Sequence, residues 1–148
     1  MSIKQTKKVL SSIVILLTLL LFIQACEKSD SKSLTGTISL TADETKTVAY
    51  QGKTVAITAT DFKDSRCPIN ADCISQGYAS VKVTFKDDVK EQDIFMCIGG
   101  CEILSVAQPK TVELNGSTYK IKLDEVTPYP TLDKSKPEVS KAKITLSE

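Results

Sequence analysis

The chain contains no histidine among its 148 residues. Ser-His-Asp and Cys-His hydrolysis need an imidazole base, and the usual catalytic zinc sites need imidazole ligands, so these classes are excluded. Chemistry that uses a pair of carboxylates stays open. The acidic residues that qualify by type are Asp61, Asp64, Asp87, Asp88, Asp124 and Glu125. Their positions favour turn-forming or solvated roles, so we expect a protein that is not an enzyme and uses no cofactor or metal.

Aromatic residues are scarce: they make up 5% of the chain, and tryptophan is absent. The missing tryptophan excludes an antibody-type immunoglobulin domain, in which a buried tryptophan packs against the inter-sheet disulfide. Carbohydrate sites usually present exposed aromatic rings, and here the tyrosines are the main candidates. Tyr119 lies on an apolar face and is expected in the core. Tyr78 and Tyr129 lie beside loops, although packing at a strand edge is the favoured role for both.

A strong excess of charge of either sign is also missing, because 19 basic residues oppose 18 acidic ones. The sequence therefore lacks the basic stripe of a nucleic-acid-binding protein, and no nucleic-acid partner is expected. Lys4, Lys7 and Lys8 are the charged residues of the first 25. Without that segment the formal net charge becomes +1 − 3 = −2.

Long hydrophobic runs are limited to Val9–Ile23, which is short for a membrane span of about 20 residues. A basic start, this apolar run and a small residue before a cysteine predict a secretory signal peptide over residues 1–25. The stretch Phe22-Ile23-Gln24-Ala25-Cys26 resembles the bacterial lipobox. The resemblance implies cleavage between Ala25 and Cys26 and acyl chains on the Cys26 thiol. An ordinary signal peptide cut elsewhere and an uncleaved anchor are the alternatives.

A polar stretch, residues 26–33, follows and is expected to be a flexible tether. Its charged residues also resemble the surface-export signals of some Gram-negative lipoproteins, and Glu27 replaces the aspartate associated with retention in the inner membrane. We therefore expect anchoring in the outer membrane through acyl chains on Cys26, on its periplasmic or its cell-surface face. Residues 34–148 are expected to form the folded domain.

Five cysteines are present, and lipidation of Cys26 leaves four. Outside the cytoplasm, four cysteines indicate two disulfides. Close spacing favours the local pairs Cys67–Cys73 and Cys97–Cys101, while crossed pairings stay open. A four-thiolate zinc site is disfavoured because its usual C-x2-C spacing is absent.

Apolar residues alternate with polar ones from Leu34 onward, which is typical of half-buried strands. Ala79–Lys86 is the clearest example, and Asn115-Gly116 predicts a tight hairpin turn. The predicted strands are Thr35–Leu40, Glu44–Tyr50, Lys53–Phe62, Ala79–Lys86, a run that ends near Cys97, Thr111–Leu114, Ser117–Val126 and Val139–Leu146. Seven to eight short antiparallel strands predict an all-β domain, either an immunoglobulin-like β-sandwich or, as the second choice, a small β-barrel.

The motif Asp64-Ser65-Arg66-Cys67-Pro68, followed by Cys73 and Gly77-Tyr78-Ala79, is similar to one found in a family of small uncharacterised bacterial lipoproteins. The stretch from Leu123 to Pro130 and the lysine-rich final strand also resemble that family, so the likeness covers about Lys53–Leu146. Ser75 stands where those proteins usually carry an aromatic residue. The resemblance implies a β-sandwich-like domain and an envelope location, and it brings no established activity.

Together these features predict a lipid-anchored, non-enzymatic binding module with a protein or glycan partner in the cell envelope. The second hypothesis is a protease inhibitor, because a short disulfide-closed loop on a β-scaffold is preorganised for binding. In that case Arg66 and Ile69 are the expected recognition positions.

Overall fold

The computed structural model describes residues 34–50, 52–106, 109–133 and 138–148. The predicted signal peptide, Cys26 and the tether lie outside these residues. Within the described part, no helix is long and apolar enough to cross a membrane.

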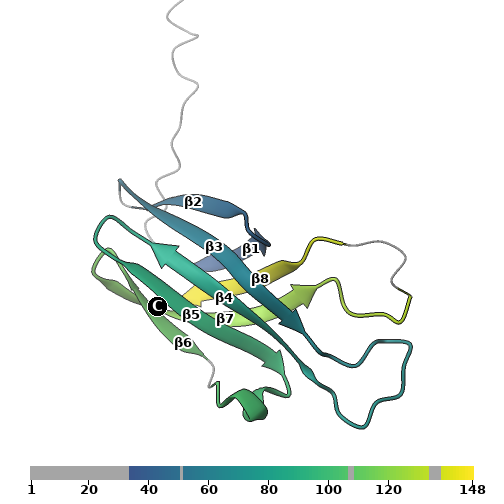
Figure 1. Cartoon of the computed structure of the whole chain (residues 1–148). Helices are drawn as coiled ribbons and strands as arrows, with labels where there is room; N and C mark the ends of the chain where they lie inside the picture. The colour runs from purple at the N-terminus through teal and green to yellow at the C-terminus, as the bar shows by residue number, and fades with distance from the viewer. Residues whose placement is uncertain (1–33, 51, 107–108, 134–137) are drawn as a thin grey trace, which may run out of the picture.

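Eight strands form two antiparallel four-stranded sheets (Figure 1). Sheet B has the order β1-β8-β7-β6, and sheet A has the order β2-β3-β4-β5. The strand bounds are β1 Gly36–Thr41, β2 Thr45–Tyr50, β3 Lys53–Asp64, β4 Tyr78–Lys86, β5 Glu91–Gly99, β6 Lys110–Leu114, β7 Ser117–Thr127 and β8 Lys141–Ser147. A short 3-10 helix, η2 (Cys101–Leu104), follows β5.

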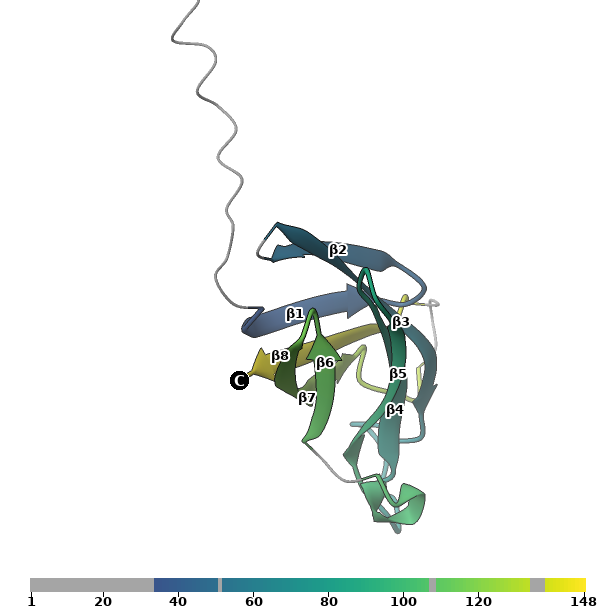
Figure 2. The same ribbon diagram turned by 90° about the vertical axis from the view of Figure 1, so that its left-hand side faces the viewer.

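The predicted β-sandwich is confirmed, and the sheets are not closed into a barrel. All neighbouring strands within a sheet are consecutive in sequence except β1 and β8. Immunoglobulin domains instead use Greek-key connections between their sheets. The likeness to immunoglobulin domains therefore lies in the two stacked layers (Figure 2) and does not extend to the strand order.

One continuous core fills the space between the sheets, and the period-two pattern explains which side chains enter it. In β4, Ala79, Val81, Val83 and Phe85 are fully buried, while Lys82 and Thr84 between them are partly exposed. The other strands contribute their alternate residues in the same way, and Tyr119 is buried as predicted. Both sheets, the core and both disulfides lie within the described part of residues 34–148.

Two side chains bridge the open sides of the sandwich, where edge strands leave carbonyl groups unpaired. Lys46 of β2 donates to the carbonyl of Ser39 in β1 at 2.7 Å. On the opposite side, Gln92 of β5 donates to the carbonyl of Glu113 in β6 at 2.6 Å. The two sheets are thereby linked along both edges.

The connections divide the sandwich into two unlike ends. The turn end holds the short connections around Gly52, Asp87 and Asn115-Gly116, together with the start of β1, where Gly36 pairs with Leu146. The loop end holds the described parts of the three long connections, which are residues 65–77, 100–109 and 128–140. The described chain therefore begins at the end of the molecule opposite the long loops (Figure 1).

Candidate functional site

Both disulfides have the local pairing favoured by the sequence. Cys67 is bonded to Cys73 and Cys97 to Cys101, each with a Cα–Cα distance of 5.9 Å. All four thiols are consumed, so the crossed pairings and the four-thiolate zinc site are excluded. Both bridges lie at the loop end.

The cysteine loop, residues 65–77, extends the β3–β4 hairpin before it opens. Ser65 N–H donates to Tyr78 C=O at 2.8 Å, and Cys67 N–H donates to Gln76 C=O at 2.9 Å. Gly77 has a φ of +64°, and a Cβ there would lie 1.9 Å from the carbonyl oxygen of Ser65. Glycine is required at this position because any side chain would collide with the backbone of the neighbouring strand.

Arg66 is a structural clamp and is not the exposed recognition residue that the inhibitor hypothesis expected. Its guanidinium makes a bidentate pair with Asp64, with Nε–Oδ1 at 2.9 Å and Nη2–Oδ2 at 2.5 Å. Nη2 also donates to the carbonyl of Val126 at 2.9 Å, and the ring of Tyr129 lies 4.2 Å from the guanidinium carbon. The Arg66 side chain is only 9% exposed, so these contacts leave it unavailable to a partner.

Backbone hydrogen bonds then join the cysteine loop to the proline loop, residues 128–140. Ile69 N–H donates to Pro130 C=O at 3.1 Å, and Leu132 N–H donates to the Asn70 side-chain oxygen at 2.8 Å. These bonds use main-chain groups, so the side chains of Ile69 and Leu132 remain outside and are 72% and 63% exposed. The two loops therefore form one braced surface.

The third connection, residues 100–109, packs beside the cysteine loop. Gly100 N–H donates to Gly77 C=O at 2.8 Å, and a Cβ on Gly99 would lie 2.8 Å from the same oxygen. The Cys97–Cys101 bridge fixes the start of η2 against the end of β5. Ile103 of η2 is 82% exposed.

Large apolar side chains that face solvent are concentrated at this end. Eight described residues of this kind are exposed, and six of them lie in the three long loops. The six are Ile69, Ile74, Ile103, Tyr129, Leu132 and Val139. Exposed apolar side chains that gather at one end of a domain are typical of interaction sites. Ile74, Leu132 and Val139 were not singled out from the sequence as exposed, because no pattern there separates an exposed aliphatic residue from a buried one.

The candidate carboxylates do not converge on one site. Asp61 pairs with Lys82 at 3.1 Å, Asp64 pairs with Arg66, and Asp124 pairs with Lys122 at 3.3 Å. Among the described residues, no group of three or more Cys, Asp or Glu side chains is placed to hold a metal ion.

Asp87 stabilises a turn, which is one of the two roles expected from the sequence for these acidic residues. Its Oδ1 accepts from the N–H groups of Val89 and Lys90, and its Oδ2 accepts from Asn115 N–H at 2.8 Å. These bonds, with that from Asn115 the strongest, lower the pKa of the Asp87 carboxyl below its usual value. The carboxylate thus ties the β4–β5 turn to the β6–β7 turn.

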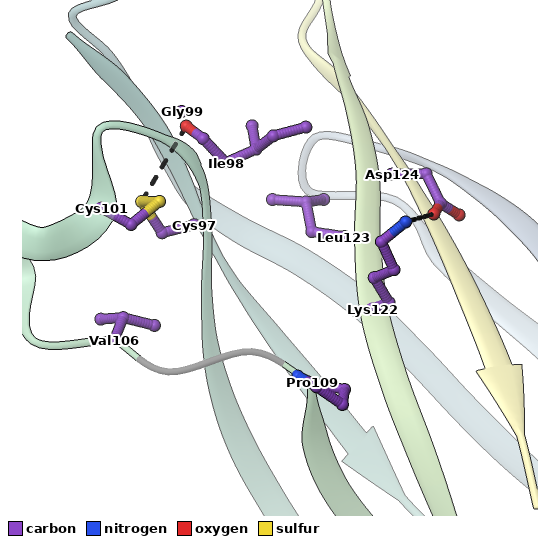
Figure 3. Close-up of a pocket in the computed structure, with 9 residues that line it drawn as sticks. All are labelled: Cys97, Ile98, Gly99, Cys101, Val106, Pro109, Lys122, Leu123 and Asp124. Carbon is purple, nitrogen blue, oxygen red and sulfur yellow. Dashed lines mark hydrogen bonds and ion pairs between the residues drawn. A yellow bond between two sulfur atoms is a disulfide. The ribbon is translucent and has the colours of Figure 1, made fainter.

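A recess of about 380 Å³ opens between β5 and β7 (Figure 3), because β6 pairs with β7 only as far as Ile121. Its wall combines the Cys97–Cys101 bridge with the side chains of Ile98 and Leu123, and the Lys122–Asp124 ion pair lies at its rim. Val106 and Pro109 line it on either side of residues outside the described part. The recess offers apolar surface, and the two charged side chains of its described lining, Lys122 and Asp124, are paired with each other.

Comparison of the chain with protein-family models, with curated proteins and with solved structures found no match. The class of the protein is thus described from its own fold and site. It is a disulfide-reinforced β-sandwich that carries a braced, apolar loop surface at one end.

Proposed function

We propose that this chain is a lipid-anchored lipoprotein of the outer membrane that acts as a non-enzymatic interaction module, with the loop end as its contact surface. The carrying observation is the concentration of six exposed apolar side chains on three loops that hydrogen bonds and two disulfides hold together. A braced surface loses little conformational entropy when it binds, which favours affinity.

The residue types favour a protein partner over a glycan. Five of the six exposed side chains are aliphatic, and Tyr129 is the single aromatic one, with Arg66 against its ring. Aliphatic side chains bind best in an apolar recess on another protein, whereas sugars need flat aromatic rings and many hydrogen bonds.

The proposed anchor and the contact surface lie at opposite ends. The chain enters the domain at the turn end, and β3 alone spans about 40 Å toward the loop end. The eight residues from Cys26 to Ser33 reach at most about 28 Å when fully extended. The loops therefore lie away from the proposed point of anchoring. In that position a partner in the envelope can reach them.

The inhibitor hypothesis is the weaker alternative. Its support is the cystine-closed loop with Ile69 and Ile74 exposed, but Arg66 is engaged and the Ile69 N–H is already bonded to Pro130. Incubation with a panel of serine and cysteine proteases tests it directly. Inhibition at micromolar protein that disappears in an Ile69→Ser variant would favour it over the interaction module.

The interaction module is tested with a triple variant, Ile69→Ser, Ile74→Ser and Leu132→Ser, in the lipidated protein. We expect the wild-type chain, extracted in mild detergent, to migrate on a native gel as part of a larger complex and the variant to migrate alone. Val89→Ser at the turn end is the matched control, since Val89 is 79% exposed and lies outside the surface. A complex that survives the triple change would contradict the proposal.

A further inference from the structure

The solvent face of sheet B carries a set of lysines that the loop surface does not use. Lys120, Lys122, Lys141 and Lys143 are exposed and alternate along β7 and β8 with buried core residues. Because strand side chains alternate between faces, all four point outward from the same sheet. Hydroxyl side chains lie beside them in register: Thr145 is opposite Lys122, and Thr41 is opposite Lys141.

Two of the three acidic residues of this face, Glu113 and Asp124, are in ion pairs. Glu113 pairs with Lys90 at 2.6 Å. Asp124 pairs with Lys122 and also accepts a hydrogen bond from Thr145 Oγ1 at 2.5 Å. Glu125 lies opposite Lys143 in the β7–β8 ladder. Four lysines oppose three carboxylates on this face, and Lys90 of β5 pairs with one of these carboxylates, so the face has a net positive charge with hydroxyl groups between its charges.

The outer face of sheet A is different. Lys82 pairs with Asp61 at 3.1 Å, and Lys86 pairs with Glu91 at 3.3 Å. By contrast, no ion pair between described residues involves Lys120, Lys141 or Lys143. Sheet A also has described lysines in no ion pair, Lys46, Lys53 and Lys63, but the three on sheet B lie on two adjacent strands of one outer face. None of the exposed large apolar residues of the described chain lies on its four strands.

We infer that the outer face of sheet B rests on an anionic lipid surface through its lysines. Sheet B is also the sheet held nearest the proposed anchor, because its edge strand β1 is the first element of the domain. A lysine held close to an anionic membrane strengthens binding about five-fold, and the attraction is screened within a Debye length. The contact orients the domain so that sheet A faces away from the membrane. The loop surface then lies at one side of the domain, where it stays accessible to a partner.

The inference rests on the proposed function only for its membrane setting, and its test omits the anchor. The probe is a set of vesicles made of phosphatidylcholine with or without phosphatidylglycerol, mixed with unlipidated residues 27–148. That segment keeps both sheets, the core and both disulfides. We expect sedimentation with the anionic vesicles at low salt, little with phosphatidylcholine alone, and loss of binding as salt rises.

Matched variants decide whether the face or only the net charge matters. The triple change Lys120→Gln, Lys141→Gln and Lys143→Gln should weaken binding to anionic vesicles on the order of a hundredfold. The triple change Lys63→Gln, Lys82→Gln and Lys86→Gln removes the same charge from sheet A and should leave most of the binding. Arginine at the three sheet B positions should restore it, which separates loss of charge from loss of folding.

Three results overturn the inference: equal loss of binding in the two glutamine triples, no binding to anionic vesicles by the wild-type segment, or equal binding to phosphatidylcholine alone. Retention on dextran sulfate without vesicle binding also overturns it, in favour of a soluble polyanion. None of these results bears on the loop surface, whose test measures complex formation in the lipidated protein.

Discussion

Arg66 joins parts of the chain that are 60 residues apart, because one guanidinium binds the Asp64 carboxylate, the Val126 carbonyl and the face of Tyr129. Such a planar fork holds several acceptors at once, which an ammonium group does not do. Of these three partners, only Asp64 is close to Arg66 in the sequence. The sequence therefore presents Arg66 as a loop arginine beside a cystine, and the partner segment 126–129 is supplied by the fold.

Arg66→Lys should loosen the loop surface without unfolding the sandwich. The lysine keeps the charge but loses the bidentate pair and the bond to Val126, at a cost of about 1.5 kcal/mol of local stability. We expect the amide protons of Ile69 and Leu132 to exchange about tenfold faster, while those of β4 stay unchanged. Lys82→Met breaks the more exposed pair with Asp61 and serves as the control. Unchanged exchange at both amides would show that Arg66 does not brace the loops.

Asp87→Asn should destabilise the whole domain by about 2 kcal/mol at neutral pH, as measured by urea unfolding. The carboxylate accepts three backbone N–H groups, and an amide in its place turns an NH2 group toward one of these donors. The neighbouring exposed Asp88→Asn should change stability by less than about 0.5 kcal/mol.

The pH dependence of stability should follow from the same carboxylate. Its folded pKa lies below that of the unfolded chain, so its contribution is present above the unfolded value of about 3.9 and is lost as the pH falls through the folded value. Urea midpoints measured downward from pH 5 should therefore fall less steeply in Asp87→Asn than in the wild type. An identical acid limb in both proteins would assign the loss to other groups.

At the scale of elements, the period-two pattern predicted seven to eight strands, and in β3, β4, β7 and β8 it also separated the face that is buried from the face that is exposed. It succeeded because the strands are half-buried, so that the buried side chains of Val55, Ile57 and Ala59 alternate with the partly exposed ones of Ala56 and Thr58. The period-two pattern did not predict the irregular positions in the strands. The bulge in β3 near Asp61 and the bulge in β7 near Asp124 come from register shifts against neighbouring strands, and single-strand alternation does not reveal them.

The disulfide pairing was predictable from the sequence, whereas most of the loop surface was not. Closeness in sequence was enough to favour Cys67–Cys73 and Cys97–Cys101, because short loops close readily. The sequence pointed to Ile69 as a recognition position, but it did not predict the rest of the surface, because Ile103 and Leu132 are brought to the same end only when β5 and β7 finish there. Turn-forming residues in the sequence did indicate where these loops lie, but they did not indicate which apolar side chains the loops expose.

The disulfide pairing can be read from a tryptic digest made without reduction. Cleavage after Arg66, Lys82, Lys90 and Lys110 places Cys67 and Cys73 on one peptide and Cys97 and Cys101 on another. Local pairing predicts two separate peptides that each gain the mass of two hydrogens on reduction. A single larger species that splits into two on reduction would establish crossed bridges.

Loss of the first bridge should have a moderate effect on stability. The double change Cys67→Ser and Cys73→Ser should lower the unfolding free energy by about 2 kcal/mol, because the closed loop is short. The core is continuous without it, so the sandwich should remain folded. Cooperative urea unfolding of this variant, shifted to a lower midpoint, is the expected observation.

At the scale of the whole molecule, the sandwich separates two kinds of surface. The loop end is apolar and braced, and the outer face of sheet B is polar and cationic. The described chain enters at the turn end, so the anchor that we propose would leave the loop end free. A stable two-sheet core makes this division possible, because stability does not depend on the side chains that face a partner.

The central claim, that the loop end is the contact surface, is tested most directly by photo-crosslinking in intact cells. A photoreactive residue is placed at Ile74 in one variant and at Val89 in the other, since both positions are highly exposed but lie at opposite ends. The account predicts one discrete adduct from position 74, abolished by Ile69→Ser and Leu132→Ser, and none from position 89. An adduct from position 89 with none from position 74 would contradict it.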